Sequence, residues 1–200
     1  RMLDERLRWD AFWALDALKG GTVRNYYEQI RDSYRYGTSI AKTREKIQNL
    51  IAHAVRTTDF YKDFDEKTTL QQLPVVNKET FRNHYAAFLS SEFKDAPDNR
   101  IMCTSGSTGT PLSMVQNRDK ILHNTAGGIF LGALGGYFIG MKEAFIRVWV
   151  NNVKKGRLAL LAENLIMMDS SSMDDRALKE MLEVIRKKKV KCLVGYSSAL

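Results

Sequence analysis

The stretch Ile101-Met102-Cys103-Thr104-Ser105-Gly106-Ser107-Thr108-Gly109-Thr110-Pro111 joins an apolar run to a loop rich in hydroxyl groups and glycine. This order predicts a strand that ends in a loop able to hold a polyanion. Gly106 and Gly109 can adopt positive φ, which lets the backbone approach a ligand closely. Successive N–H groups can then point into one concavity and bind phosphate oxygens. The hydroxyl groups add further hydrogen-bond donors without adding bulk.

The loop differs from the two commonest phosphate-binding patterns. In the pattern G-x-x-x-x-G-K-[ST] the glycines are farther apart than Gly106 and Gly109, and a lysine follows them. The dinucleotide pattern G-x-G-x-x-G is absent, and Pro111 would interrupt a helix that began directly at the loop. A plain Ser/Thr/Gly turn between two strands is the alternative interpretation, because such clusters are mostly loops.

Residues 104–111 resemble the signature loop of the adenylate-forming superfamily, which includes acyl-CoA synthetases, luciferases and peptide-synthetase adenylation domains. Within it, the chain is most similar to the phenylacetate–CoA ligase group and its capsular polysaccharide biosynthesis (CapK-type) relatives. Three further segments are similar and follow in family order. They are a short aromatic segment at Thr58–Lys62, an "LPxxxKxxxR" stretch at Leu73–Arg82, and a "GYPSxL" stretch at Leu193–Leu200, with Ser197 where proline is usual.

The resemblance implies an enzyme that activates a carboxylic acid as an acyl-adenylate, using ATP and Mg²⁺, and then transfers the acyl group to CoA. It implies that the nucleotide phosphates are bound by Thr104, Ser105, Gly106, Ser107, Thr108, Gly109 and Thr110. Among these we expect Ser107 and Thr108 to be hydroxyl donors. Tyr196 and Ser197 are expected near the acyl or adenine pocket, with a plain strand-end aromatic as the alternative for Tyr196.

The chain departs from the family pattern at one position and covers only part of it. Many members carry a lysine directly after the loop proline, where this chain has Leu112. The family's magnesium-binding glutamate, ribose-binding aspartate and C-terminal lysine have no counterpart here, so no catalytic or metal-binding residue is assigned. Arg1 is not an initiator methionine, and Leu200 lies within an apolar segment. We therefore expect these residues to be the first part of a longer protein and to be inactive alone.

Composition supports a folded chain with an anionic partner. The 200 residues are 44% apolar, which is enough for a core, and the formal net charge of +8 suits ATP, CoA, nucleic acid or an anionic membrane. Cys103 and Cys192 form neither a disulfide framework nor a zinc site. We expect both to be buried small hydrophobes in a reducing cytoplasm. The three histidines lack metal-ligand spacing.

Residues 125–141 are uncharged and contain five glycines before Gly140. They fall short of the roughly 20 residues that a membrane span needs, so we expect a buried helix and no integral membrane segment. The basic run 186–189 is expected to be a solvated helix end rather than a nucleic-acid patch.

Residues 1–97 predict a mainly helical N-terminal region. Apolar residues recur near the helical period, and Thr22, Ser39 and Asn77 are candidate N-caps. The expected helices are Arg1–Lys19, Val23–Tyr36, a third that follows Ser39, and Lys78–Leu89. The aromatic residues of this region are expected to pack between helices rather than stack on nucleic-acid bases.

Residues 98–200 predict an α/β portion that contains the phosphate-binding loop, as an incomplete large domain. Alternating strands and helices indicate α/β layering. The expected strands are Arg100–Thr104, Leu112–Gln116, Ala144–Val150, Leu158–Met168 and Val190–Gly195. The expected helices are Arg118–Ile139 and Met173–Lys188.

Three rival functions remain open at this point. The first is a repurposed or non-catalytic nucleotide-binding CapK-type protein of polysaccharide biosynthesis, since a fold and a phosphate loop do not establish CoA ligation. The second is a basic helical protein that binds nucleic acid or a membrane surface, with binding that weakens steeply as salt rises. The third is an interaction module that forms an oligomer through its aromatic N-terminal helices.

Overall fold

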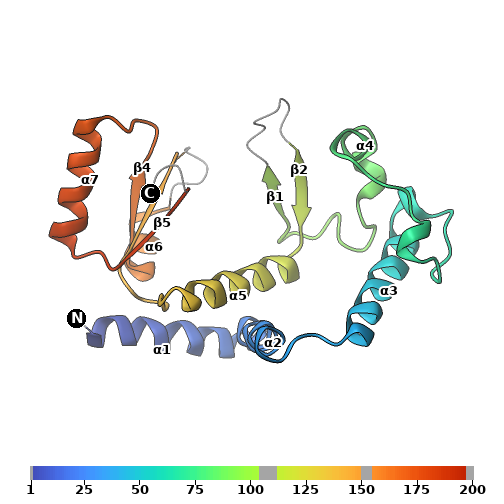
Figure 1. Cartoon of the computed structure of the whole chain (residues 1–200), viewed down its shortest axis with the longest axis horizontal. Coiled ribbons are helices and arrows are strands. Elements are labelled where there is room, and N and C mark those ends of the chain that lie inside the picture. Colours follow the sequence, from blue (N-terminus) through green and yellow to red (C-terminus); the bar gives the residue numbers. More distant parts are fainter. Residues whose placement is uncertain (1, 104–111, 150–154, 197–200) are drawn as a thin grey trace. The chain divides into compact units, whose positions relative to one another are not determined.

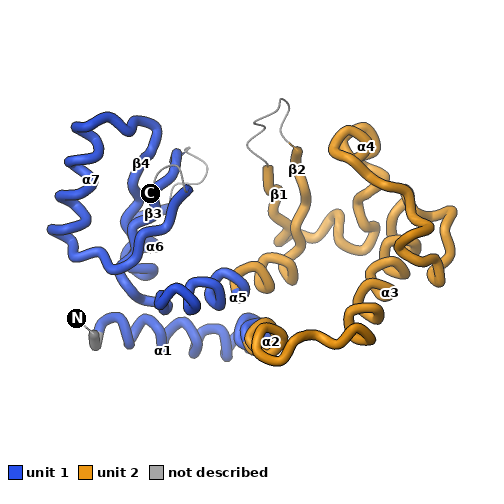
Figure 2. The backbone as a smooth tube through the Cα atoms, viewed as in Figure 1, with its two compact units in different colours: residues 1–27, 126–200 blue, residues 28–125 orange. Residues whose placement is uncertain are grey.

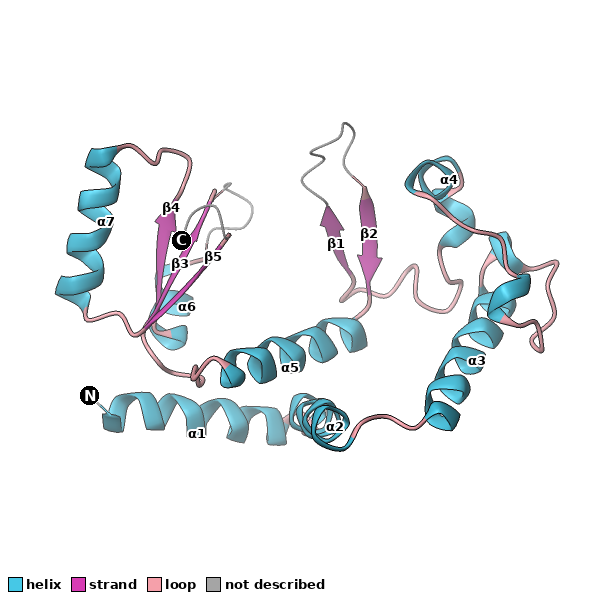
Figure 3. Cartoon of the chain, in the orientation of Figure 1, coloured by secondary structure: helices cyan, strands magenta, loops and turns pink. Residues whose placement is uncertain are grey.

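A computed structural model describes residues 2–103, 112–149 and 155–196 (Figure 1). Helices dominate its first half, and strands and helices alternate in the second, which confirms a mixed α/β chain (Figure 3). The elements are α1 (Met2–Leu18), α2 (Thr22–Tyr36), α3 (Ile40–Thr57), η1 (Asp59–Tyr61), η2 (Leu70–Gln72), α4 (Lys78–Asn83), η3 (Tyr85–Phe88), β1 (Arg100–Cys103), β2 (Ser113–Gln116), α5 (Arg118–Leu134), β3 (Glu143–Arg147), α6 (Arg157–Glu163), β4 (Leu165–Asp169), α7 (Asp175–Lys188) and β5 (Cys192–Gly195), where η marks a 3₁₀ helix.

The chain divides into two compact units (Figure 2). Unit 1 joins residues 1–27 to residues 126–200, and unit 2 is residues 28–125. Near Pro97 the chain changes from helices alone to alternating strands and helices. This change lies inside unit 2 and does not coincide with the boundary between the two units. Unit 1 is therefore discontinuous in sequence, with α1 belonging to the same unit as the α/β portion.

A three-stranded parallel sheet forms the centre of unit 1. The strand order is β4-β3-β5, so β3 is the middle strand. Ala144, Ile146 and Met168 are buried on one face of the sheet, and Met181 and Ile185 of α7 pack against them. Figure 1 shows α7 alongside this sheet. Helix α7 begins at Asp175 rather than at the predicted Met173, and it ends at Lys188 as predicted. Asp174 caps its start by accepting the Ala177 N–H (2.8 Å), and the basic residues occupy its last turn as expected.

The prediction of one strand over Leu158–Met168 is wrong. Its first half is helix α6, and its second half enters strand β4. Leu, Ala and Glu are strong helix formers, which explains the helix over Arg157–Glu163. Asn164 then takes a left-handed conformation (φ 55°) and ends it. The apolar run thus contains two elements of different period, separated by one polar residue.

Helix α1 carries an aromatic cluster that forms the second part of the unit 1 core. Trp13 is 6% exposed, and its ring contacts those of Trp9 and Tyr27 at centroid distances of 5.6 and 5.9 Å. Tyr27 in turn contacts Phe130 of α5 (6.1 Å). The expected packing role of the aromatic residues is confirmed for these side chains. Tyr34 and Tyr36 differ, because both are largely exposed.

The cap of α2 differs from the prediction. The sequence predicts Thr22 as the N-cap, but α2 begins at Thr22 itself. The carboxylate of Asp16 on α1 accepts the backbone N–H groups of Val23 (3.1 Å) and Arg24 (3.0 Å) instead. Asp16 is 9% exposed. A residue of the preceding helix therefore satisfies the free N–H groups at the start of α2.

Unit 2 is organised around α3. Ser39 caps this helix as predicted, with its hydroxyl accepting the Lys42 N–H (3.2 Å). Asn77 caps α4 by accepting the Thr80 N–H (2.8 Å), also as predicted. The expected helix Lys78–Leu89 is interrupted, however, since α4 ends at Asn83 and a 3₁₀ helix follows.

Helix α5 is shorter than predicted and only partly buried. It ends at Leu134 rather than Ile139, before the glycine pair Gly135-Gly136. Ala126 and Phe130 are buried, whereas Leu131 and Leu134 are exposed, so the expectation of a buried helix holds for only part of α5. Within the described parts of the chain, no helix has the length and apolar character of a membrane span.

Candidate functional site

The predicted phosphate loop connects two paired strands of unit 2. Strands β1 and β2 are antiparallel, and Cys103, the last residue of β1, is the direct partner of Ser113, the first residue of β2. The proposed phosphate ligands, Thr104, Ser105, Gly106, Ser107, Thr108, Gly109 and Thr110, lie outside the described residues. The structure therefore fixes the two strands that carry the loop.

Helix α5 begins at the end of the β1–β2 hairpin that lies away from Cys103 and Ser113. Gln116, the last residue of β2, pairs with Arg100 at the end of the hairpin away from the loop, and α5 begins at Arg118. A four-residue strand spans about 13 Å, so the N-terminus of α5 is separated from the loop by the length of β2.

The expectation that Cys103 is a buried hydrophobe is wrong, because its side chain is exposed. Ile101 and Met102 are exposed as well, at 69% and 51%. A two-stranded hairpin has too few neighbours to bury both faces, so an apolar sequence does not produce burial here. The Cys103 sulfur lies 3.3 Å from the Ser113 hydroxyl.

Two other segments singled out in the sequence meet in an aromatic cluster of unit 2. Phe60 of the Thr58–Lys62 segment and Phe81 of the Leu73–Arg82 segment both stack on Phe88, at 4.0 and 4.9 Å between ring centroids. Sequence reasoning missed Phe88, which joins them. Packing within this cluster therefore accounts for the aromatic residues Phe60 and Phe81 in the two segments.

The remaining predicted site residue, Tyr196, directly follows β5 at the carboxyl edge of the parallel sheet. Its side chain is 60% exposed, and Ser197 lies beyond the described residues. Ile146 of β3 pairs with Gly195, so Arg147 and Tyr196 are the next residues along two adjacent strands. Sequence analysis missed Arg147, although a single charge inside the apolar run Ala144–Val150 is a visible signal.

A cluster of titratable groups lies at the opposite, amino edge of the sheet. Glu143 begins β3 and pairs with Cys192, the first residue of β5. Burial raises the pKa of the Glu143 carboxyl above its ordinary value, although a hydrogen bond from Tyr137 opposes the shift. Burial also raises the pKa of the Tyr137 hydroxyl, with Glu143 adding to the shift. The pKa of the Cys192 thiol is raised mainly by burial, which disfavours its reactive thiolate.

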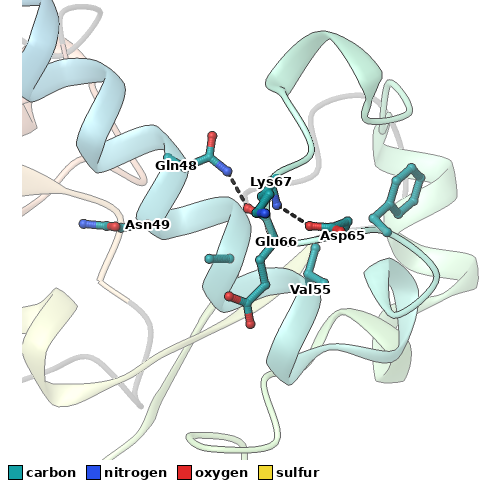
Figure 4. Close-up of a pocket in the computed structure, with 8 residues that line it drawn as sticks. Gln48, Asn49, Val55, Asp65, Glu66 and Lys67 are labelled. Atoms are coloured by element: carbon teal, nitrogen blue, oxygen red, sulfur yellow. Dashed lines mark hydrogen bonds between the residues drawn. The ribbon is translucent and has the colours of Figure 1, made fainter.

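A shallow hollow in unit 2 lies between α3 and the turn at residues 65–67 (Figure 4). The Gln48 side-chain amide donates to the Glu66 carbonyl, and the Lys67 backbone N–H donates to the Asp65 carboxylate (2.7 Å). These polar groups satisfy one another, so we assign the hollow no function. Its lining residues are Gln48, Asn49, Ala52, Val55, Phe64, Asp65, Glu66 and Lys67.

No group of three or more His, Cys, Asp or Glu side chains in the described ranges could hold a metal ion. Comparison of the chain with protein-family models, curated proteins and solved structures gave no match.

Proposed function

We propose that the protein activates a carboxylic acid with ATP as an acyl-adenylate and then transfers the acyl group to the thiol of CoA, which forms a thioester and releases AMP. The observation that supports this proposal is the sequence Thr104–Pro111 between the paired ends of β1 and β2. Glycines and hydroxyl residues in this order suit a loop that wraps phosphate groups with N–H and O–H donors. ATP and CoA are cytoplasmic metabolites, so this activity would place the protein in the cytoplasm.

In the proposed reaction, a carboxylate oxygen of the acid forms a bond to the α-phosphorus of ATP. The bond from that phosphorus to the oxygen bridging the α- and β-phosphates breaks, and pyrophosphate leaves. The loop would hold the β- and γ-phosphates and stabilise the negative charge that grows on the leaving oxygen. Oriented donors are effective in this role because they need little reorganisation during the reaction, and positioning the acid in line with the leaving group supplies much of the remaining rate.

Ser107 and Thr108 are the proposed hydroxyl donors, and Gly106 and Gly109 allow the backbone to approach the phosphates. Mg²⁺ is the metal that the proposed chemistry requires to offset phosphate charge. The described residues contain no cluster of three or more His, Cys, Asp or Glu side chains that could hold it.

The test is pyrophosphate release by the intact protein with ATP, Mg²⁺ and a panel of aryl and alkyl acids. The Thr108→Ala/Gly109→Ala double variant removes a hydroxyl donor and restricts the backbone of the loop. Ser113→Ala is the matched control, since it removes a hydroxyl just outside the loop, 3.3 Å from the Cys103 sulfur. The proposal expects acid-dependent release that the double variant loses and the control keeps.

A nucleotide-binding protein without catalytic activity is the second candidate. The observation that favours it is Leu112, which stands where many members of the resembled family carry a lysine. This candidate predicts ATP binding that depends on Thr108 and Gly109, with no pyrophosphate release for any acid.

A further inference from the structure

We propose that unit 1 carries an oxyanion-binding position at the carboxyl edge of its parallel sheet, with the guanidinium of Arg147 as the binding group. The ligand class is a compound with a carboxylate or a phosphate group. This inference is independent of the proposed activity, because it involves neither ATP chemistry nor the loop of unit 2.

The topology of the sheet places Arg147 where ligands bind in open parallel sheets. The chain runs from the middle strand β3 through α6 to β4 on one side, and then through α7 to β5 on the other side of β3. The direction of strand addition therefore reverses at β3. Ligands of such sheets bind outside the carboxyl ends of the strands at the reversal point. Arg147 is the last residue of β3, and Tyr196 directly follows β5 at the same edge.

The Arg147 side chain has a buried hydrogen-bond donor that no described residue accepts. Its Nε atom is buried and has no hydrogen-bond acceptor in the described parts of the chain. None of the salt bridges between described residues includes Arg147. A buried donor without an acceptor is unfavourable. The guanidinium fork matches the paired oxygens of a carboxylate or a phosphate, so such a group would supply the missing acceptor.

Two aromatic rings fix the guanidinium in place. Its central carbon lies 5.7 Å from the centre of the Phe145 ring and 5.3 Å from that of Trp149. Trp149 is itself anchored, since it is 8% exposed and its indole N–H donates to the Met168 carbonyl (2.9 Å). Because the rings restrict the arginine before a ligand arrives, less conformational entropy is lost on binding.

The residue that pairs with Arg147 on the neighbouring strand, Asp169, has a carboxylate that takes part in a turn. Asp169 ends β4 opposite Arg147, and its Oδ1 atom accepts the Ser171 backbone N–H (3.0 Å). The Ser170 N–H donates to the Arg147 carbonyl (3.1 Å), which ties this turn to the end of β3. The turn thus supports the backbone of Arg147.

The experiment follows the Arg147 Nε–H resonance by NMR in the intact protein, with benzoate and inorganic phosphate as separate probes. The resonance is identified by its absence from the spectrum of Arg147→Lys. We expect a saturable shift with at least one anion, and the anion that causes it identifies the ligand as a carboxylate or a phosphate. We expect Arg147→Gln to bind that anion about ten-fold more weakly or worse.

Arg186→Gln is the matched control, because it removes the same charge from the basic end of α7. It should bind the anion as the unmodified protein does. An Nε–H resonance that neither anion shifts would overturn the inference. Equal affinity of Arg147→Gln and Arg186→Gln would overturn it as well. Neither result bears on whether the loop of unit 2 is needed for the release of pyrophosphate.

Discussion

Gly140 occupies a turn of unit 1 that excludes a side chain for two reasons. Its φ of 97° lies in a region that residues with a side chain rarely adopt. A Cβ atom at this position would lie 2.5 Å from the Glu5 carbonyl oxygen and 2.9 Å from the Arg8 Cβ of α1. The Gly140 carbonyl also accepts the side-chain amide of Asn164 (2.9 Å). One glycine therefore lets α1 approach the turn that leads to β3.

We predict that Gly140→Ala lowers the free energy of unfolding by about 2 kcal/mol or more, from backbone strain plus steric overlap. Gly136→Ala is the control, since its φ is 82° and a Cβ there would meet no atom within 4 Å. The control should show the backbone cost alone, about 1 kcal/mol. Chemical denaturation measures both. Equal losses would show that α1 does not approach Gly140 as described.

The second prediction concerns Asp16. Replacing Asp16 with Ala removes both acceptors at the start of α2 and should cost about 2 kcal/mol of stability. Asp16→Asn keeps one acceptor oxygen and should cost less. Thermal or urea unfolding of the two variants checks the order, and an alanine variant as stable as the asparagine variant would argue against this cap.

At the scale of elements, local signals predicted the structure where one residue determines an outcome. Ser39 and Asn77 were recognised as caps because a side-chain oxygen needs only the next turn of chain to find its partner. The sequence predicts one strand over Leu158–Met168, where the structure has a helix and a strand, because a continuous apolar run does not reveal its period. Cys103 was misassigned because burial depends on what covers a strand, and the sequence of a hairpin does not contain that information.

The pH dependence of stability follows from Glu143 at the start of β3. Its pKa is raised above its ordinary value of 4.5, chiefly by burial. Between 4.5 and the raised value, the folded state binds more protons than the unfolded state, so stability falls as pH rises through this window. We predict that Glu143→Gln removes this loss and stabilises the protein at neutral pH, with the advantage over the unmodified protein shrinking toward pH 4.5.

Urea denaturation at a series of pH values tests the Glu143 prediction. Glu183→Gln on α7 is the control, because its side chain is exposed. An identical pH profile for Glu143→Gln and the unmodified protein would contradict the assignment of this dependence to Glu143.

At the scale of the whole molecule, sequence reasoning did not predict that α1 contacts α6 and the residue that precedes β5. Lys191 donates to the Glu5 carboxylate (2.7 Å), and Arg8 donates to the Leu161 carbonyl. Neither contact has a local signature, since the partners are far apart in sequence. The sequence predicts that the aromatic residues of α1 pack between helices, but it does not predict that Phe130 of α5 joins their cluster. Arg147 was missed for the same reason, because its importance depends on the order of three strands.

A double-mutant cycle measures the Glu5–Lys191 contact. Glu5 is 5% exposed overall, while the Lys191 side chain is 40% exposed, so we predict a coupling of about 1 kcal/mol rather than the larger values of fully buried pairs. The pair Arg6–Asp10 on the surface of α1 is the control, with side chains 74% and 56% exposed. Its coupling should be about 0.3 kcal/mol. A Glu5–Lys191 coupling no larger than the control would contradict the joining of α1 to the sheet.

The central claim is that the loop between β1 and β2 binds the phosphates of ATP during acid activation. The most direct measurement is acid-dependent pyrophosphate release by the intact protein, beside the Thr108→Ala/Gly109→Ala variant and the Ser113→Ala control. We predict release with at least one acid, lost in the double variant and retained in the control, with all three proteins equally folded. Folded protein that releases no pyrophosphate with any acid, or a double variant as active as the control, would contradict the claim.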